Sequence, residues 1–191
     1  MNRVITTRTT KLFTCGLSCF SLGLVICLIL KPIGLSVNAG ISYFGNYRLT
    51  IIPYAIAIMG YGLFALLIAA SLNAADVLPL RYSFYGFALL CLIITITPYS
   101  VSSFFNIAHT TAGTILFVWQ LVLSGWLIAK IKDKLWPIIF SGLMLLSGIG
   151  AALYLHGAHG LLIQTQIVFQ LSFAALIYYA FNKLSVKSSR T

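Results

Sequence analysis

Six apolar stretches, each about as long as a membrane-spanning helix, limit the possible folds of this chain more than any other feature. They cover residues 12–30, 49–73, 82–104, 107–129, 136–155 and 160–182, and none contains an aspartate, glutamate, lysine or arginine. A helix needs about 20 apolar residues to cross a hydrocarbon core of about 30 Å. Backbone polar groups in lipid must be hydrogen-bonded within their own segment, so these stretches predict helices. The expected fold is an all-α integral membrane protein, a six-helix transmembrane bundle that forms one domain over residues 1–191.

Composition supports this fold class. Of the 191 residues, 60% are hydrophobic and only 7% are charged, whereas soluble domains are about 25% charged. The formal net charge of +10 raises the question of nucleic-acid binding. The basic residues, however, lie at the ends of the apolar stretches, where they orient a membrane protein, and nucleic acid is not an expected partner.

The positions of the basic residues predict the orientation of the bundle. If the spans alternate in direction, only Lys31 and Arg48 fall on one side. The other side then carries Arg3, Arg8, Lys11, Arg81, Lys130, Lys132, Lys134, Lys183, Lys187 and Arg190. The positive-inside rule therefore places both termini in the cytoplasm. Short loops and this charge bias favour the bacterial inner (cytoplasmic) membrane as the location.

The first stretch is longer than the core of about 7–15 residues in a signal peptide, so we expect it to be retained.

Proline and small residues predict local features of the helices. Pro98 lacks a backbone N–H and is expected to kink the third span about one turn before its outer end. Gly148 and Ala152 lie four residues apart in the fifth span, and the second span carries Gly60 and Gly62. Such small residues predict close contacts between helices.

Hydrogen-bonding side chains gather on the predicted outer side, although this side has little net charge. The first outer loop, GISYFGNYR over residues 40–48, contributes several of them, and we expect it to cover a shallow outer pocket. The candidate ligand-binding residues are Ser42, Tyr43, Asn46, Arg48, Asn106, His109, His156, His159, Gln166 and Gln170.

The three histidines all fall on the outer side and leave several interpretations open. His156 and His159 have the i, i+3 spacing of a helical zinc-ligand pair, with His109 as a third ligand. A bis-histidine haem between the fourth and fifth spans is another interpretation. No carboxylate lies on this side to complete a metal site, so we assign no metal and no cofactor. The expected role of His156 and His159 is a polar interfacial turn.

Two further polar features lie deeper in the predicted bundle. His109 stands at the outer end of the fourth span, where an ionisable group facing the bundle indicates a functional role, or a capping or loop-bonding one. Gln120 and Gln170 are close to the predicted midplane and can bond to each other or to a lipid. Gln166 and Gln170 share one helix face, and this spacing predicts that they line a narrow polar path from the outer side toward the midplane.

The sequence assigns no catalytic residue. Both aspartates, Asp76 and Asp133, fall on the cytoplasmic side, away from every histidine, so a Ser–His–Asp set is excluded. No phosphate-binding loop or nucleotide fingerprint is present. An enzyme of this sequence would have to work with histidine, serine and tyrosine at the outer surface.

The first outer loop reads ISYFG over residues 41–45, and the fourth span opens with NIAHTTAGTILFVWQ over residues 106–120. These two motifs resemble the DRAM-like family (damage-regulated autophagy modulators) and related bacterial six-span proteins of unknown function. Tyr43 and Phe44 stand where an acidic residue is often found in that family. The resemblance implies a membrane protein linked to lipid organisation or signalling, without established catalytic chemistry. The matching residues are Ile41, Ser42, Gly45, His109, Gly113 and Phe117.

These observations predict a multi-pass membrane protein, non-enzymatic, with an outer polar pocket that binds a lipid or small amphipathic ligand. Membrane lipids and other membrane helices are the expected partners. One alternative is a histidine-based enzyme or haem or metal carrier at the outer face. Another is a small transporter or a subunit of a membrane complex.

Overall fold

The protein is a bundle of six long helices in the computed structural model, which describes residues 5–32, 40–73, 75–99, 101–155 and 161–187. All six helices are long and apolar enough to cross a membrane, so this is a multi-pass membrane protein. Two short 3₁₀ segments accompany them, and no strand occurs in the described residues. The elements are α1 (Thr7–Leu30), η2 (Ile41–Asn46), α2 (Ile51–Ser71), η3 (Ala75–Val77), α3 (Leu78–Ile96), α4 (Ser103–Lys130), α5 (Leu135–Leu155) and α6 (Leu162–Lys187).

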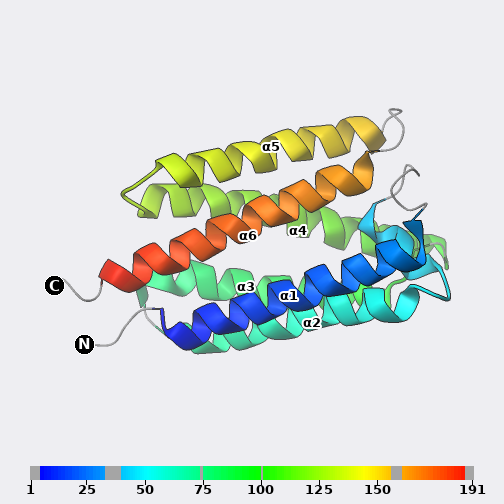
Figure 1. Ribbon diagram of the computed structural model, residues 1–191, viewed down its shortest axis with the longest axis horizontal. Helices are drawn as coiled ribbons and strands as arrows, with labels where there is room; N and C mark the ends of the chain where they lie inside the picture. Colours follow the sequence, from blue (N-terminus) through cyan, green and yellow to red (C-terminus); the bar gives the residue numbers. More distant parts are fainter. Residues whose placement is uncertain (1–4, 33–39, 74, 100, 156–160, 188–191) are drawn as a thin grey trace.

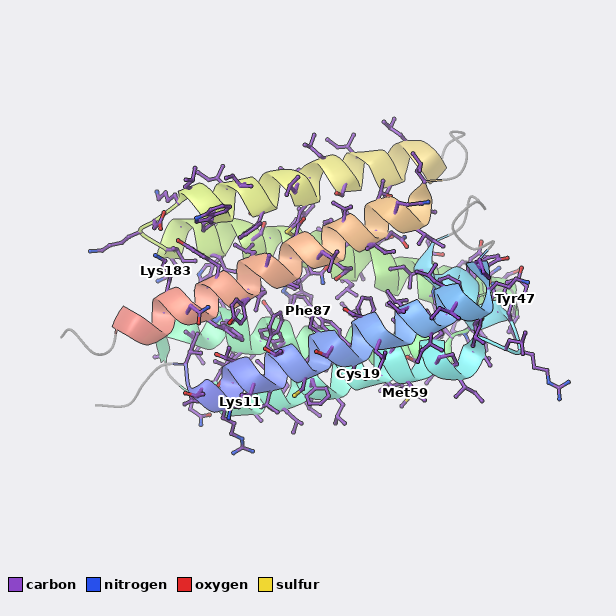
Figure 2. All side chains as sticks on the ribbon, in the orientation of Figure 1. Lys11, Cys19, Tyr47, Met59, Phe87 and Lys183 are labelled. Carbon is purple, nitrogen blue, oxygen red and sulfur yellow. The ribbon has the colours of Figure 1, made fainter. Side chains whose placement is uncertain are left out.

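Consecutive helices run antiparallel, so α1 begins and α6 finishes at the same end of the bundle (Figure 1). We call this end the terminal end and the opposite one the loop end. Lys11 and Lys183 lie at the terminal end, and Tyr47 lies at the loop end (Figure 2). Helices α1, α2 and α3 pack in order, α5 packs on α6, and α6 also contacts α1 and α4. The positive-inside rule predicts that the terminal end faces the cytoplasm.

Helix α3 is shorter than the sequence predicts. It ends at Ile96, and α4 starts at Ser103, so the predicted outer end of the third span at residue 104 and the predicted kink at Pro98 are wrong. The residue before a proline is biased away from helical conformation, which stops the helix at this point. The Thr97 N–H still bonds to the Ile93 carbonyl at 3.0 Å. The described residues 97–99 and 101–102 therefore lie outside both helices, at the loop end.

An aromatic cluster fills the core from the terminal end to about the middle of the bundle. Its members come from α1, α3 and α6, and each is buried. Ring centroids lie 5.6 Å apart for Phe13 and Phe181, and 5.7 Å apart for Phe87 and Phe173, in edge-to-face geometry. Such pairs add about 0.5–1.5 kcal/mol each beyond area burial. The aromatic cluster consists of Phe13, Phe84, Phe87, Phe173 and Phe181.

Glycines lie where neighbouring helices pack closely, as the sequence predicts. A Cβ on Gly62 would lie 2.9 Å from the Cβ of Cys91, so α2 and α3 meet closely here. A Cβ on Gly148 would collide with the Phe117 ring of α4. Both glycines are therefore required by packing.

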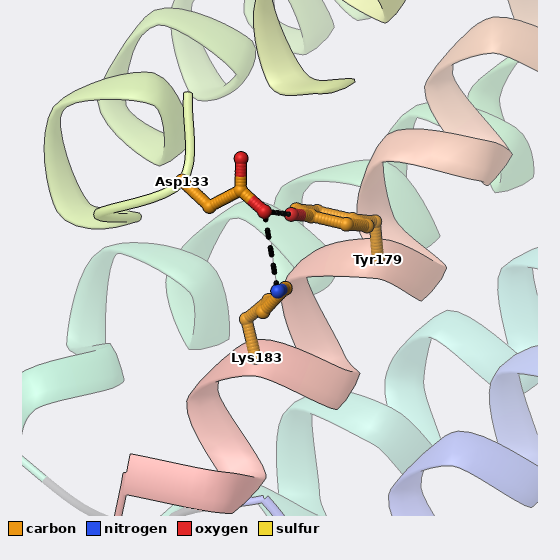
Figure 3. A network of polar contacts seen from close by, with 3 residues as sticks. All are labelled: Asp133, Tyr179 and Lys183. Atoms are coloured by element: carbon orange, nitrogen blue, oxygen red, sulfur yellow. Dashed lines mark hydrogen bonds and ion pairs between the residues drawn. The ribbon is translucent and has the colours of Figure 1, made fainter. Parts of the chain in front are cut away.

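A polar network ties the loop before α5 to α6 at the terminal end (Figure 3). The Oδ2 atom of Asp133 accepts hydrogen bonds from the Tyr179 hydroxyl at 2.6 Å and from Lys183 Nζ at 3.2 Å. The hydrogen bonds from Tyr179 and Lys183 hold the pKa of Asp133 below its usual value of 3.8. These contacts are exposed to solvent, so their contribution to stability depends on pH and salt.

Candidate functional site

The η2 segment folds back over the loop end of the bundle. The side chain of Phe44 is buried beneath it, and the carbonyl of Phe44 accepts a hydrogen bond from Thr50 Oγ1 at 2.6 Å. A Cβ on Gly45 would lie 2.8 Å from the Tyr54 ring, so glycine is needed for this close approach. The first outer loop is thus a packed element and more than a connector.

His109 of α4 is buried and joins η2 to the loop after α3. Its Nδ1 atom lies 2.8 Å from the Thr97 carbonyl oxygen, and its Nε2 atom lies 2.7 Å from Ser42 Oγ. A carbonyl oxygen can only accept, so Nδ1 carries a hydrogen. In the neutral imidazole Nε2 then has a free lone pair, and the Ser42 hydroxyl donates to it. The structure shows the loop-bonding role that the sequence predicts for His109, and the functional role stays a prediction.

Gln166 of α6 holds the other end of the η2 segment. Its Oε1 atom accepts a hydrogen bond from the Ile41 N–H at 2.7 Å, across 125 residues of sequence. A Cβ on Gly40 would lie 2.8 Å from the Gln166 amide, so a larger residue would disturb this contact. The η2 segment is therefore fixed by side chains of α2, α4 and α6.

A cavity of about 140 Å³ lies under η2, between the helices. Most of its wall is apolar, and the polar groups are hydroxyls and side-chain amides. An apolar wall with a few fixed polar groups is typical of ligand pockets. The lining residues are Phe20, Ile41, Ser42, Tyr54, Ile58, Tyr61, Cys91, Ile94, Gly113, Leu116, Phe117, Gln166, Phe169 and Gln170.

The side of the cavity facing the terminal end is bounded by packed side chains. Gln170 exchanges two hydrogen bonds of 3.2 Å with the fully buried Gln120, which confirms that these amides bond to each other. The Phe169 ring stacks on Phe117 with centroids 4.1 Å apart. Phe169 also belongs to the same buried core as the aromatic cluster. The cavity and the aromatic core therefore follow one another along the bundle.

The structure brings together four of the ten predicted site residues. Ser42, Gln166 and Gln170 line the cavity, and His109 lies directly behind Ser42. Within the described part of the chain, no group of three His, Cys, Asp or Glu residues is placed to hold a metal ion. His156 and His159 lie outside the described residues, so the zinc and haem interpretations that need them stay predictions.

The remaining predicted residues are placed away from the cavity. Asn46 and Arg48 are exposed, and Asn106 lines a separate shallow hollow beside Tyr99. The Tyr43 ring packs against Tyr47, with centroids 4.6 Å apart. The Tyr47 side chain, by hydrogen bonding, and partial burial raise the pKa of Tyr43 to about 12. Tyr43 therefore stays a neutral phenol at physiological pH.

Sequence reasoning missed three groups of this site. Tyr54 and Tyr61 of α2 line the cavity, and their spacing of seven residues puts both on one helix face. That periodicity could have been read from the sequence. The third group is the Thr97 carbonyl, a backbone atom for which no side-chain pattern gives a signal.

Comparison of the chain with models of protein families, with curated proteins and with solved structures finds no match. The site is therefore interpreted from its own geometry.

Proposed function

We propose that this multi-pass membrane protein binds a lipid or small amphipathic molecule in the cavity under η2. The proposed location is a bacterial cytoplasmic membrane, with η2 on the outer side. The observation that carries this proposal is the cavity itself, an apolar space with hydroxyl and amide groups in its wall. An amphipathic ligand needs both an apolar surface and a few hydrogen-bonding groups.

The size of the cavity limits which part of a ligand enters it. A cavity of about 150 Å³ accepts a molecule of the size of benzene. Pockets for whole drug-sized ligands are larger, about 300–1,000 Å³. The space of about 140 Å³ therefore suits one short apolar segment, such as part of a single acyl chain. The polar part of the ligand would remain beside Ser42 and Gln166.

The residues that carry the resemblance to the DRAM-like family support a shared ligand site. They come from two distant segments of the sequence, and five of the six surround one space. We extend the proposal to a relationship with that family on this ground. Ile41, Ser42, Gly113 and Phe117 line the cavity, and His109 bonds to Ser42.

The test fills the cavity while leaving the fold in place. A Cβ on Gly113 meets nothing within 4 Å, so Gly113→Leu directs a bulky side chain into the cavity. Gly125 of the same helix is also open, and Gly125→Leu is the matched control. The full chain in nanodiscs is irradiated with a diazirine-bearing fatty acid, and crosslinked protein is measured by mass spectrometry.

We expect Gly113→Leu to reduce crosslinking at least tenfold, equivalent to about 1.4 kcal/mol of binding free energy. Gly125→Leu should crosslink like the unchanged protein. Equal crosslinking of both variants, or no crosslinking of the unchanged chain inside the cavity, would refute the proposed function.

A further inference from the structure

We propose that Ser42 and His109 form a catalytic dyad that hydrolyses an acyl ester whose chain lies in the cavity. This inference rests on the proposed function and adds a reaction to it. A nucleophile within hydrogen-bond reach of a base, which is itself oriented by a third group, is the arrangement that activates serine. The third group here is the Thr97 carbonyl.

The distances meet the requirement of such a dyad. Ser42 Oγ lies 2.7 Å from His109 Nε2, and His109 Nδ1 lies 2.8 Å from the Thr97 carbonyl oxygen. Heavy-atom separations of about 2.6–3.2 Å are those expected between nucleophile and base. The carbonyl fixes the hydrogen on Nδ1, so the basic lone pair of the neutral ring points at the serine.

The fold also places the two residues correctly relative to the cavity. Ser42 lines the cavity, whereas His109 is 6% exposed and stands behind it. The nucleophile thus meets a ligand carbonyl, and the base is shielded from bulk solvent. An ester is the fitting substrate class, because its acyl chain matches the apolar wall and its carbonyl would lie beside Ser42.

The reaction proceeds in two balanced steps. In the first step, Ser42 Oγ attacks the ester carbonyl carbon, and the hydroxyl proton of Ser42 passes to His109 Nε2. The carbon–oxygen ester bond then breaks, Nε2 gives the proton to the leaving alcohol, and an acyl-serine remains. Water next attacks the acyl-serine, giving its proton to Nε2. The bond to Ser42 Oγ breaks, the proton returns to the serine, and a carboxylic acid is released. The Thr97 carbonyl keeps the imidazole oriented throughout.

Two side chains beside Ser42 are suited to stabilise the negative oxygen that forms during attack. Tyr54 lines the cavity and interacts with Ser42. Gln166 uses Oε1 to accept from Ile41, which leaves its N–H₂ group as the donor available to a ligand. Hydrogen-bond donors aimed at a developing oxyanion are a large part of catalysis in acyl transfer.

The test uses the full chain in nanodiscs, with 4-nitrophenyl butyrate as substrate and an alkyl fluorophosphonate as covalent probe. Peptide mass spectrometry locates the label, which is expected on Ser42. Ser42→Ala and His109→Gln should each lower hydrolysis at least about a hundredfold, because removal of either member disables a Ser–His pair. Ser103→Ala, a change of an exposed serine at the start of α4, is the matched control.

Crosslinking of the diazirine fatty acid, measured on the same samples, separates the two proposals. Ser42→Ala should still crosslink, which also shows that the variant is folded. If the unchanged chain binds the fatty acid but carries no label on Ser42, the dyad is refuted and the proposed function stands. Failure to bind the fatty acid would refute both.

Discussion

His109 connects three parts of the loop end through two ring nitrogens. It belongs to α4, bonds to the loop after α3 through Thr97, and bonds to η2 through Ser42. The sequence predicts a histidine facing the bundle at this depth. The Thr97 carbonyl is available only because Pro98 stops α3 and frees it from the helical hydrogen-bond pattern. A residue outside the predicted site thus decides which tautomer the site residue adopts.

At the other end of the bundle, Asp133 gives a pH-dependent prediction. Its pKa is lower in the folded protein than in the unfolded chain, mainly because Tyr179 and Lys183 donate hydrogen bonds to it. A depressed carboxyl pKa stabilises the fold at pH values above the unfolded pKa, and this contribution is lost as the pH falls through the folded pKa. We expect the thermal midpoint of the unchanged protein to fall as the pH drops below about 4, the usual carboxyl range.

The variant Asp133→Asn cannot titrate and should lack this part of the pH dependence. The measurement is the midpoint of thermal unfolding in detergent between neutral and acidic pH. Asp76→Asn, which removes the other aspartate, is the control and should follow the unchanged protein. Identical curves for the unchanged protein and Asp133→Asn would show that the network contributes nothing to stability.

At the scale of elements, η2 is the part of the fold that the sequence describes least. Its Gly-rich and aromatic composition predicts a loop that covers a pocket, and the structure forms a 3₁₀ segment over Ile41–Asn46. The segment is held by Thr50, just before α2, and by Gln166 of α6. The contact with Gln166 depends on helix packing, which a local pattern does not encode.

Gly40 offers a test of this anchoring. Its backbone φ of −80° is compatible with alanine, so Gly40→Ala acts only through contact with the Gln166 amide. We expect faster amide hydrogen exchange over residues 41–46, because the bond from the Ile41 N–H to Gln166 is displaced. Gly142→Ala places a methyl group in open space and is the control. Unchanged exchange in η2 would mean that the glutamine moves aside without loss of the bond.

At the scale of the whole molecule, the two halves of the bundle differ in packing. The aromatic cluster fills the core from the terminal end to about the middle of the bundle, where Phe87 lies among the helices (Figure 2). The other half contains the cavity and nearly all polar groups of the site. Lipid tails are as apolar as these side chains, so packing within the bundle, more than removal of apolar surface from water, holds the helices together.

Orientation is also a property of the whole molecule and can be measured directly. Arg48→Cys and Lys132→Cys place reactive thiols in loops of opposite ends. The positive-inside rule predicts that a membrane-impermeant maleimide applied outside intact cells labels Arg48→Cys and spares Lys132→Cys until the cells are opened. The unchanged chain, with its four natural cysteines, is the background control. The reverse labelling pattern would show that the bundle has the opposite orientation, with the cavity on the cytoplasmic side.

The sequence by itself determined the six helices, their approximate bounds and the gathering of polar groups at one end. Apolar length and charge position are local properties, and each span satisfies its backbone hydrogen bonds within itself. Tertiary structure decided that Ser42 meets His109 across 67 residues and that Ile41 meets Gln166 across 125. It also decided where the cavity lies. These contacts depend on the distances and rotations of packed helices, which arise from the fit of many side chains and from no single stretch of sequence.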